Sequence, residues 1–185
     1  MATTKHTLVA LVENKPGVLN RVSSLLRRRG FNIESIAVGP SELAGLSRMV
    51  FIIDGAEETV EQARKQLAKL IDVVKVSDIT EADIVARELA LIKVHATTAN
   101  RSEIVQIVSI FRANIIDVAH DSLTIEVTGD EDKVDSLYDL LRAFGIKEFT
   151  RTGRIAMLRG GTSQVQVEEK LFSARKKAQG TPQSW

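Results

Sequence analysis

Residues 6–30 have the sequence HTLVALVENKPGVLNRVSSLLRRRG and contain the pattern that decides the fold. The run 6–13 is rich in β-branched residues, and after a break apolar residues recur at helical spacing from Val18 onward. Three arginines and Gly30 then mark a helix end, because cations suit the negative end of the helix dipole and glycine tolerates the left-handed conformation. The segment predicts a strand joined to a helix by the turn at residues 14–17.

The rest of the first 80 residues completes an alternation of strands and helices. The predicted elements after the first helix are two strands, a helix and a closing strand, over residues 33–38, 48–54, 57–70 and 73–76. The predicted helix at residues 57–70 begins with two glutamates and carries Glu61 four residues before Lys65, a favourable pair on a helix surface. The order is therefore strand, helix, strand, strand, helix, strand.

The same order returns after a polar linker at residues 78–87. The predicted segments of the second half are residues 89–94, 104–111, 115–119, 123–127 and 134–144, with a last strand from residue 146. Residues 31–33 (FNI) and 113–115 (ANI) occupy the same place after the first helix of each half. We expect an α+β protein with two ferredoxin-like βαββαβ units in tandem, each with two helices on one face of a four-stranded antiparallel sheet.

Three regions are expected along the chain: a first domain at residues 1–80, a second at 81–159 and a tail at 160–185. The tail is rich in Gly, Ser, Thr, Gln and Lys, so we expect it to be mobile or ordered by a partner. A unit of this size buries only about 60% of the surface of its unfolded chain and is marginal alone. Because each unit gains stability by covering an exposed sheet edge, we expect a homodimer.

The composition excludes several classes of protein. Among 185 residues, 25 Lys or Arg and 24 Asp or Glu leave a formal net charge of +1, which is not the footprint of a nucleic-acid-binding protein. The absence of cysteine excludes disulfides, Cys-ligated zinc, iron–sulfur clusters and thiol catalysis. The apolar runs are too short to span a membrane, and residues 1–5 lack the apolar core of a signal peptide. We expect a cytoplasmic protein with neither a membrane nor a nucleic acid as partner.

The turn between the first strand and the first helix is a candidate anion site. Pro16 suits the first helical turn, where its missing N–H is no loss, and Gly17 allows a ligand to approach the backbone closely. A carboxylate over free N–H groups at a helix N-terminus meets hydrogen-bond donors and the positive end of the helix dipole. The alternative, which spacing alone leaves open, is that Asn14 or Lys15 simply caps the helix.

Asn32 begins the second predicted strand, which this topology places at a sheet edge. If two copies pair side by side, Asn32 approaches the first junction of the neighbouring copy, where it meets Asn14. Asparagine offers a carbonyl to an ammonium group and an amide donor to a carboxylate, so this pair suits a free α-amino acid. The alternative is that Asn32 is a left-handed helix cap after Gly30.

Several segments carry a resemblance to one known family. The first half resembles the ACT domain of the small, regulatory subunit of acetolactate synthase (acetohydroxyacid synthase) in residues 11–19 (LVENKPGVL), 28–36 (RRGFNIESI) and 46–49 (LSRM). The second half is similar to the C-terminal domain of that family in residues 87–94 (RELALIKV), 111–118 (FRANIIDV) and 158–160 (LRG). The resemblance covers residue 6 to about residue 160, and the NIES and NIID segments together make it specific.

This resemblance implies a regulatory subunit of branched-chain amino acid biosynthesis that has no catalytic site of its own. It implies binding of valine, and less selectively of other branched-chain amino acids, between two ACT domains. The implied site residues are Asn14, Gly17 and Asn32, with the backbone amides of Val18 and Ile33 as neighbours. The family inhibits and also activates a large catalytic subunit that uses thiamine diphosphate, magnesium and FAD, so these cofactors are expected in the partner and none in this chain.

The remaining polar residues predict no catalytic or metal site. His6, His95 and His120 lack metal-ligand spacing, and each lies at or near a predicted strand end. The glycines at 153, 160 and 161 form neither a dinucleotide-binding pattern nor a P-loop. The acidic run at residues 130–132 is most simply a helix start, although a surface cation could visit it.

Nucleic-acid binding, or sensing of another amino acid by a ferredoxin-like module, is the alternative function. RNA-recognition modules of this architecture need exposed aromatic residues on central strands. Aromatic residues make up 4% of this chain, and Phe51 is the only one on the central strand of the first unit, within the apolar run 49–53. Nucleic-acid recognition therefore has less support than sensing of an amino acid.

Overall fold

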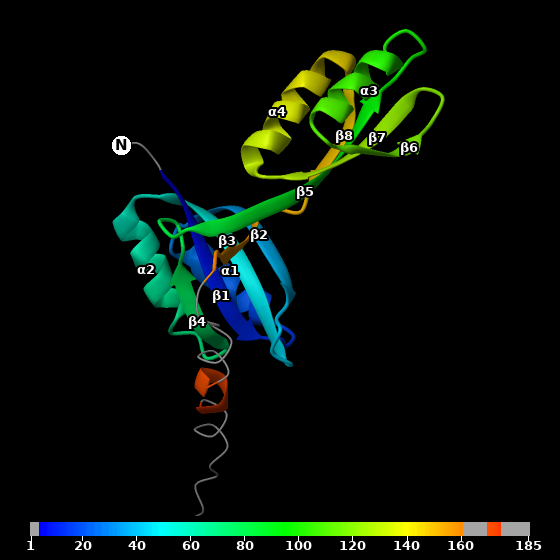
Figure 1. Ribbon diagram of the computed structural model, residues 1–185. Helices are drawn as coiled ribbons and strands as arrows, with labels where there is room; N and C mark the ends of the chain where they lie inside the picture. Colours follow the sequence, from blue (N-terminus) through cyan, green and yellow to red (C-terminus); the bar gives the residue numbers. More distant parts are fainter. Residues whose placement is uncertain (1–3, 161–169, 175–185) are drawn as a thin grey trace, which may run out of the picture. The chain divides into compact units, whose positions relative to one another are not determined.

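The computed structural model of the protein describes residues 4–160 and 170–174. The chain divides into two units. The described residues of the first lie within Met1–Ile84 and Met157–Trp185, and those of the second within Val85–Ala156. Each unit has one antiparallel sheet with a pair of α-helices (Figure 1). The expectation of two ferredoxin-like units in tandem is confirmed.

The first unit follows the order strand, helix, strand, strand, helix, strand. Its elements are β1 (Thr4–Glu13), α1 (Val18–Arg28), β2 (Asn32–Pro40), β3 (Leu46–Gly55), α2 (Glu57–Leu67) and β4 (Val73–Asp78). The strands lie in the order β2-β3-β1-β4, and every neighbouring pair is antiparallel. Strands β1 and β3 are central, whereas β2 lies at an edge with β3 as its one strand neighbour among the described residues.

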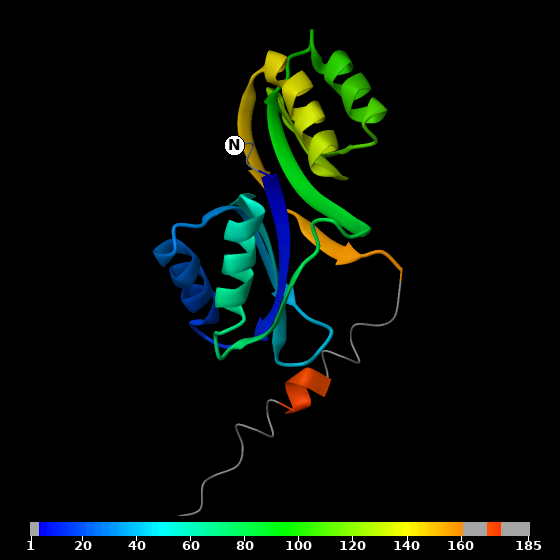
Figure 2. The ribbon, with the colours of Figure 1, turned by 90° about the vertical axis from the view of Figure 1, so that its left-hand side faces the viewer.

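Helices α1 and α2 cover the same face of the first sheet (Figure 2). Successive residues of a strand point to opposite faces, so alternate residues of β1 and β3 enter the core, while each helix contributes a stripe at a spacing of three or four. The buried cluster comprises Leu8, Ala10, Val12, Val18, Val22, Leu26, Met49, Phe51, Ile53, Val60, Ala63, Leu67, Val73 and Val76. Burial of this apolar surface is the main force that holds the unit together.

The second unit repeats this plan. Its elements are β5 (Ile84–His95), α3 (Arg101–Ile110), β6 (Asn114–Val118), β7 (Ser122–Gly129), α4 (Glu131–Leu141), a 3₁₀ turn (Arg142–Phe144), β8 (Ile146–Arg151) and β9 (Ile155–Leu158), although Ile84 and the last two residues of β9 are assigned to the first unit. The strand order is β6-β7-β5-β8, and β9 also pairs with β5. Its core likewise joins alternate strand residues to the apolar stripes of α3 and α4.

The structure differs from the predicted elements at several points. Helix α2 ends at Leu67 rather than at Leu70, because the N–H of Leu70 donates to the carbonyl of Leu67 in a tighter turn. Strand β5 begins within the predicted polar linker, at Ile84, and β9, which was not predicted, also pairs with β5. The sequence pattern also missed β9, a strand of four residues.

The predicted tail falls almost wholly outside the described residues. Of residues 161–185 the structure describes 170–174, which are helical. No helix in the described part of the chain is both long and apolar enough to cross a membrane.

Candidate functional site

The turn between β1 and α1 has a geometry that differs from the predicted one. Pro16 does not lie in the first helical turn, because α1 begins at Val18. Gly17 is the N-cap residue and has a φ of 84°, in the left-handed region. A residue with a β-carbon is strained in this region, so the reversal of direction before α1 depends on glycine.

The alternative in which Asn14 or Lys15 caps α1 is wrong, since no side chain accepts a hydrogen bond from the start of the helix. The Nζ of Lys15 instead lies 2.5 Å from Oε2 of Glu13, so Lys15 turns back along β1. The side chain of Asn14 is exposed and makes no hydrogen bond within the described residues. Its amide is therefore available to a ligand.

Backbone donors remain unused at the start of α1. The N–H groups of Gly17, Leu19 and Asn20 have no acceptor within the described part of the chain, whereas the N–H of Val18 donates to the carbonyl of Lys15 at 3.3 Å. Such donors at the positive end of a helix dipole favour an anion. Among the predicted site residues, Gly17 thus contributes a free amide and Val18 an engaged one.

Arg21 also belongs to this site, although the sequence pattern did not predict it. Its Nη1 lies 3.3 Å from the position that a β-carbon on Gly17 would occupy. Its Nε donates to Oδ2 of Asp72 at 2.6 Å, which holds the guanidinium beside the turn. The junction therefore combines a helix N-terminus with a guanidinium that Asp72 holds in place. No local pattern reveals this, because Asp72 lies 51 residues away along the chain.

Asn32 begins β2 in extended conformation, so its alternative role as a left-handed cap is wrong; Gly30 has the positive φ of 74° instead. Its side chain is exposed and makes no hydrogen bond within the described residues. Its neighbour Ile33 packs against the core. A second unused asparagine amide thus stands at the edge of the sheet.

A single chain does not bring the two asparagines together. Glu13, next to Asn14, pairs with Leu46 at the start of β3, whereas Asn32 pairs with Asp54 near its end. At roughly 3.4 Å per residue the eight residues from 46 to 54 separate these positions by about 27 Å. One small ligand cannot reach both within a single copy.

The edge strand β2 also exposes apolar side chains. Ile36 is 36% exposed and Val38 is 48% exposed. They pair with the buried Phe51 and Met49 of β3, so they belong to the face of the sheet that the helices cover. Their exposure is a consequence of the edge position, because no further strand flanks β2 among the described residues.

The corresponding positions of the second unit are engaged. The side chain of Asn114, at the start of β6, donates to Oε1 of Glu126 at 3.2 Å. Before α3, the side chain of Asn100 accepts a hydrogen bond from the N–H of Thr97 at 2.7 Å. These asparagine side chains of the second unit each make a hydrogen bond, unlike Asn14 and Asn32 of the first.

The other polar candidates have structural explanations. Asp130 is the N-cap of α4 and accepts from the N–H of Lys133 at 2.9 Å, as expected of a helix start. No three His, Cys, Asp or Glu side chains gather to hold a metal ion within residues 4–160 and 170–174. Phe51 is buried in the core of the first unit and offers no surface on which a base could stack.

Two family models match the chain. The model described as AHAS small subunit-like ACT domain matches residues 8–75, and the model described as small subunit of acetolactate synthase matches residues 87–160. Each match covers most of one unit. The resemblance noted in the sequence is confirmed.

Individual relatives agree with these models. The probable acetolactate synthase small subunit of Archaeoglobus fulgidus is 60% identical over 156 residues, which are 84% of this chain and 98% of that protein. The acetolactate synthase small subunit of Bacillus subtilis is 48% identical over 170 residues, which are 91% of this chain and 98% of that protein.

A solved structure shows the same fold. The crystal structure of the acetolactate synthase small subunit from Thermotoga maritima has a TM-score of 0.79 and 46% sequence identity, and covers 86% of this chain and 99% of that chain. The match in sequence and structure extends across both units, so the chain belongs to the family of acetolactate synthase small subunits, and its first unit is an ACT domain.

Proposed function

We propose that this subunit binds valine at a seam between the ACT domains of two copies, and that it transmits feedback inhibition to a large catalytic subunit that it also activates. The observation that carries the proposal is the set of unused donors and acceptors at two ends of one sheet. These are the amides of Gly17, Leu19 and Asn20 and the side chains of Asn14 and Asn32.

Pairing of two β2 strands joins these groups. In an antiparallel pair about a twofold axis, Asn32 of one copy lies beside the Pro40 end of β2 in the other. Pro40 pairs with Ser47 of β3, and the N–H of Asn14 donates to the carbonyl of Gly45 at 2.8 Å, so this end of β2 lies at the same end of the sheet as the β1–α1 turn. The pairing also covers the exposed Ile36 and Val38.

The chemistry of the seam suits a zwitterion. The free N–H groups at the start of α1, together with Arg21, stabilise the carboxylate of an amino acid. The carbonyl oxygens of Asn14 and Asn32 accept hydrogen bonds from its ammonium group. Valine has about eight non-hydrogen atoms, and at roughly 0.7–1 kcal/mol per atom its Kd lies between micromolar and millimolar, a range suited to metabolite feedback.

Regulation follows from the position of the ligand between two chains. Valine stabilises one arrangement of the paired ACT domains, and only its difference in affinity between arrangements can change the activity of a partner. In this account the thiamine diphosphate, magnesium and FAD belong to the catalytic subunit. The reaction occurs there, and this chain supplies the sensor.

Titration calorimetry with L-valine tests the site. We expect Asn14→Ala and Asn32→Ala each to weaken binding by at least about tenfold, the loss of one hydrogen bond to a charged group. Asn114→Ala is the matched control: it removes the equivalent side chain of the second unit and should leave the affinity within about twofold.

Two results would overturn the proposal. One is the absence of any heat or thermal shift with valine, leucine or isoleucine up to millimolar concentration. The other is wild-type affinity in both asparagine variants, which would place the site elsewhere.

A further inference from the structure

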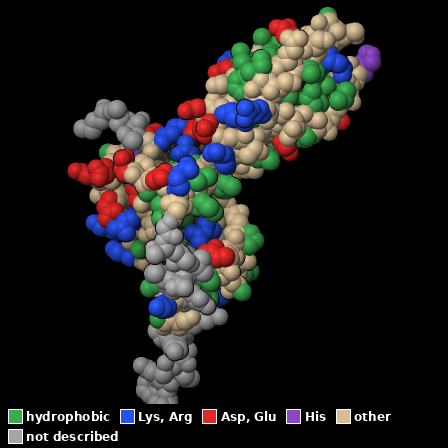
Figure 3. All heavy atoms as spheres, in the orientation of Figure 1, with side chains coloured by type: hydrophobic (Ala, Val, Ile, Leu, Met, Phe, Trp, Pro, Cys, Tyr) green, Lys and Arg blue, Asp and Glu red, His purple; other side chains and the backbone are tan. Residues whose placement is uncertain are grey.

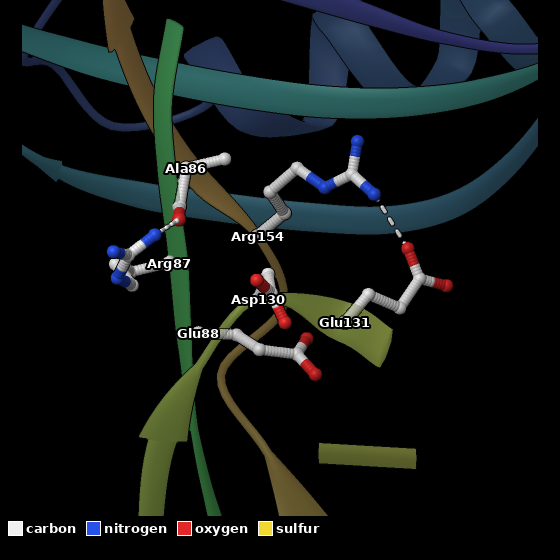
Figure 4. Close-up of a pocket in the computed structure, with 6 residues that line it drawn as sticks. All are labelled: Ala86, Arg87, Glu88, Asp130, Glu131 and Arg154. Atoms are coloured by element: carbon white, nitrogen blue, oxygen red, sulfur yellow. Dashed lines mark hydrogen bonds and ion pairs between the residues drawn. The ribbon is translucent and has the colours of Figure 1, made fainter. Parts of the chain in front are cut away.

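A hollow lies in the second unit and is lined by none of the residues of the proposed valine site. It has a volume of about 200 Å³ and is lined by Ala86, Arg87, Glu88, Asp130, Glu131 and Arg154 (Figure 4). These residues come from β5, from the start of α4 and from the connection between β8 and β9. All six belong to the same unit.

Glu88 is the unusual member of this lining. It is 5% exposed and lies on the helix-covered face of β5, in line with the core residues Ala90 and Ile92. Its Oε1 is buried and has no hydrogen-bond partner among the described residues. Burying a carboxylate oxygen without a hydrogen bond has a large desolvation cost, so the burial of Glu88 requires an explanation.

The nearby cations are already engaged with other carboxylates. Nη2 of Arg151 lies 2.6 Å from Asp135, whereas its Nη1 is 3.4 Å from Oε1 of Glu88. Nη2 of Arg154 lies 2.5 Å from Glu131. Arg87 follows Ala86 on β5 and points away from Glu88, with its Nη1 donating to the carbonyl of Ala86 (Figure 4).

Glu88 therefore has an ion pair with Arg151, but its buried Oε1 accepts no hydrogen bond among the described residues. Burial raises the pKa of Glu88 above its ordinary value of 4.5; Arg151 and Arg154 lower it, and the charges of Glu131 and Asp135 raise it again. A cationic donor in the hollow would supply the missing hydrogen bond and a counter-charge that is not shared with Asp135.

We propose that this hollow binds a small molecule carrying a protonated primary amine, with the carboxylate of Glu88 as its counter-ion. An ammonium group has three donors and fits between Glu88 and the acidic residues at the start of α4. The hollow is smaller than the 300–1,000 Å³ typical of drug-sized ligands, so it suits an alkyl amine of a few carbons. This site is additional to the proposed valine site and uses none of its residues.

The test uses the full chain and propylammonium as the probe. Carboxyl carbons of glutamate are labelled, and the NMR shift of Glu88 is followed as propylammonium chloride is added. We expect a saturable shift, and no such response to propionate. Glu88→Gln keeps the shape of the side chain and should raise the Kd by about tenfold or more, followed by calorimetry. Glu148→Gln, at an exposed position on β8, is the matched control and should change nothing.

The pH dependence gives an independent readout in the unaltered protein. Binding requires the ionised carboxylate, so affinity should fall as the pH decreases through the raised pKa of Glu88. The groups that surround Glu88 and set this pKa are Arg151 on β8, Glu131 and Asp135 on α4, and Arg154. An affinity that does not change between about pH 4 and about pH 8, a range that begins near the ordinary carboxyl pKa, contradicts the proposal.

Equal binding of propionate, an unsaturable shift, or wild-type affinity in folded Glu88→Gln would also overturn it. The result is separable from the valine site, because Asn32→Ala is expected to retain propylammonium binding. Loss of valine binding alone, or of amine binding alone, therefore identifies which of the two proposals fails.

Discussion

At the scale of single residues, Gly17 determines how the chain enters α1. Its positive φ turns the backbone, and its missing side chain leaves room for the guanidinium of Arg21. Neither property involves a contact that Gly17 makes itself. Because Gly17 has no side chain, it can adopt this φ and does not cover the neighbouring backbone amides, which remain accessible to a ligand.

Substitution of Gly17 by alanine should lower the free energy of unfolding by about 1 kcal/mol. The cost of a β-carbon in the left-handed region, roughly 1–2 kcal/mol, exceeds the roughly 0.4–1 kcal/mol gained by restricting the unfolded chain. Urea unfolding at a fixed protein concentration measures the difference.

Gly55→Ala is the control for this prediction. Its φ is not in the left-handed region, and its added β-carbon would meet Thr59 at an ordinary 3.6 Å. We expect no loss of stability there. Equal stability of Gly17→Ala and the unaltered protein would show that the turn does not depend on glycine.

At the scale of elements, the proposed dimer and its ligand site depend on the edge strand β2. It presents backbone groups and the apolar side chains of Ile36 and Val38, the arrangement that natural proteins usually protect or pair. In the proposed dimer each β2 gains a second neighbour, and the two sheets become continuous. The ligand site then depends on an element that a single copy leaves incomplete.

A charge in this strand should separate the copies without unfolding them. In the proposed dimer, Ile36→Lys places an ammonium group against the β2 strand of the other copy, which carries the same charge. We therefore expect a monomer in sedimentation experiments, together with loss of valine binding. Because Ile36 is already partly exposed, far-ultraviolet circular dichroism should stay unchanged.

Leu140→Lys, at a similarly exposed position on α4, serves as the control and should remain dimeric. A dimeric Ile36→Lys that binds valine normally would rule out β2 as the seam.

Sequence periodicity predicted most helices and strands, but not the conformation of the residues at their ends. The stripes of α1 and α4 and the continuous apolar run of β3 appear directly in the sequence, since a helical stripe and an uninterrupted apolar run are distinct patterns. The prediction that Pro16 lies in the first helical turn was wrong. Proline is common there, but in this chain Gly17 is the N-cap and α1 begins after it. Strand β9 was missed because four residues are too few for a period to show.

At the scale of the whole molecule, the two units share a fold but differ in the hydrogen bonding of equivalent asparagines. Both units have the same topology, yet the asparagine that begins β6 is bound to Glu126 whereas the one that begins β2 is unengaged. The sequence pointed to Asn14, Gly17 and Asn32 through a family resemblance. It could not reveal Arg21 beside the turn or Glu88 in its hollow, because both depend on partners distant in the chain.

The central claim is that each valine site takes Asn14 from one copy and Asn32 from the other. Mixing the Asn14→Ala and Asn32→Ala proteins tests it, because each mixed dimer regains one intact site and one doubly altered site. After free exchange of an equal mixture, calorimetry should recover about one quarter of the wild-type valine sites at wild-type affinity. No recovery of binding after complete exchange would contradict a site shared between two chains.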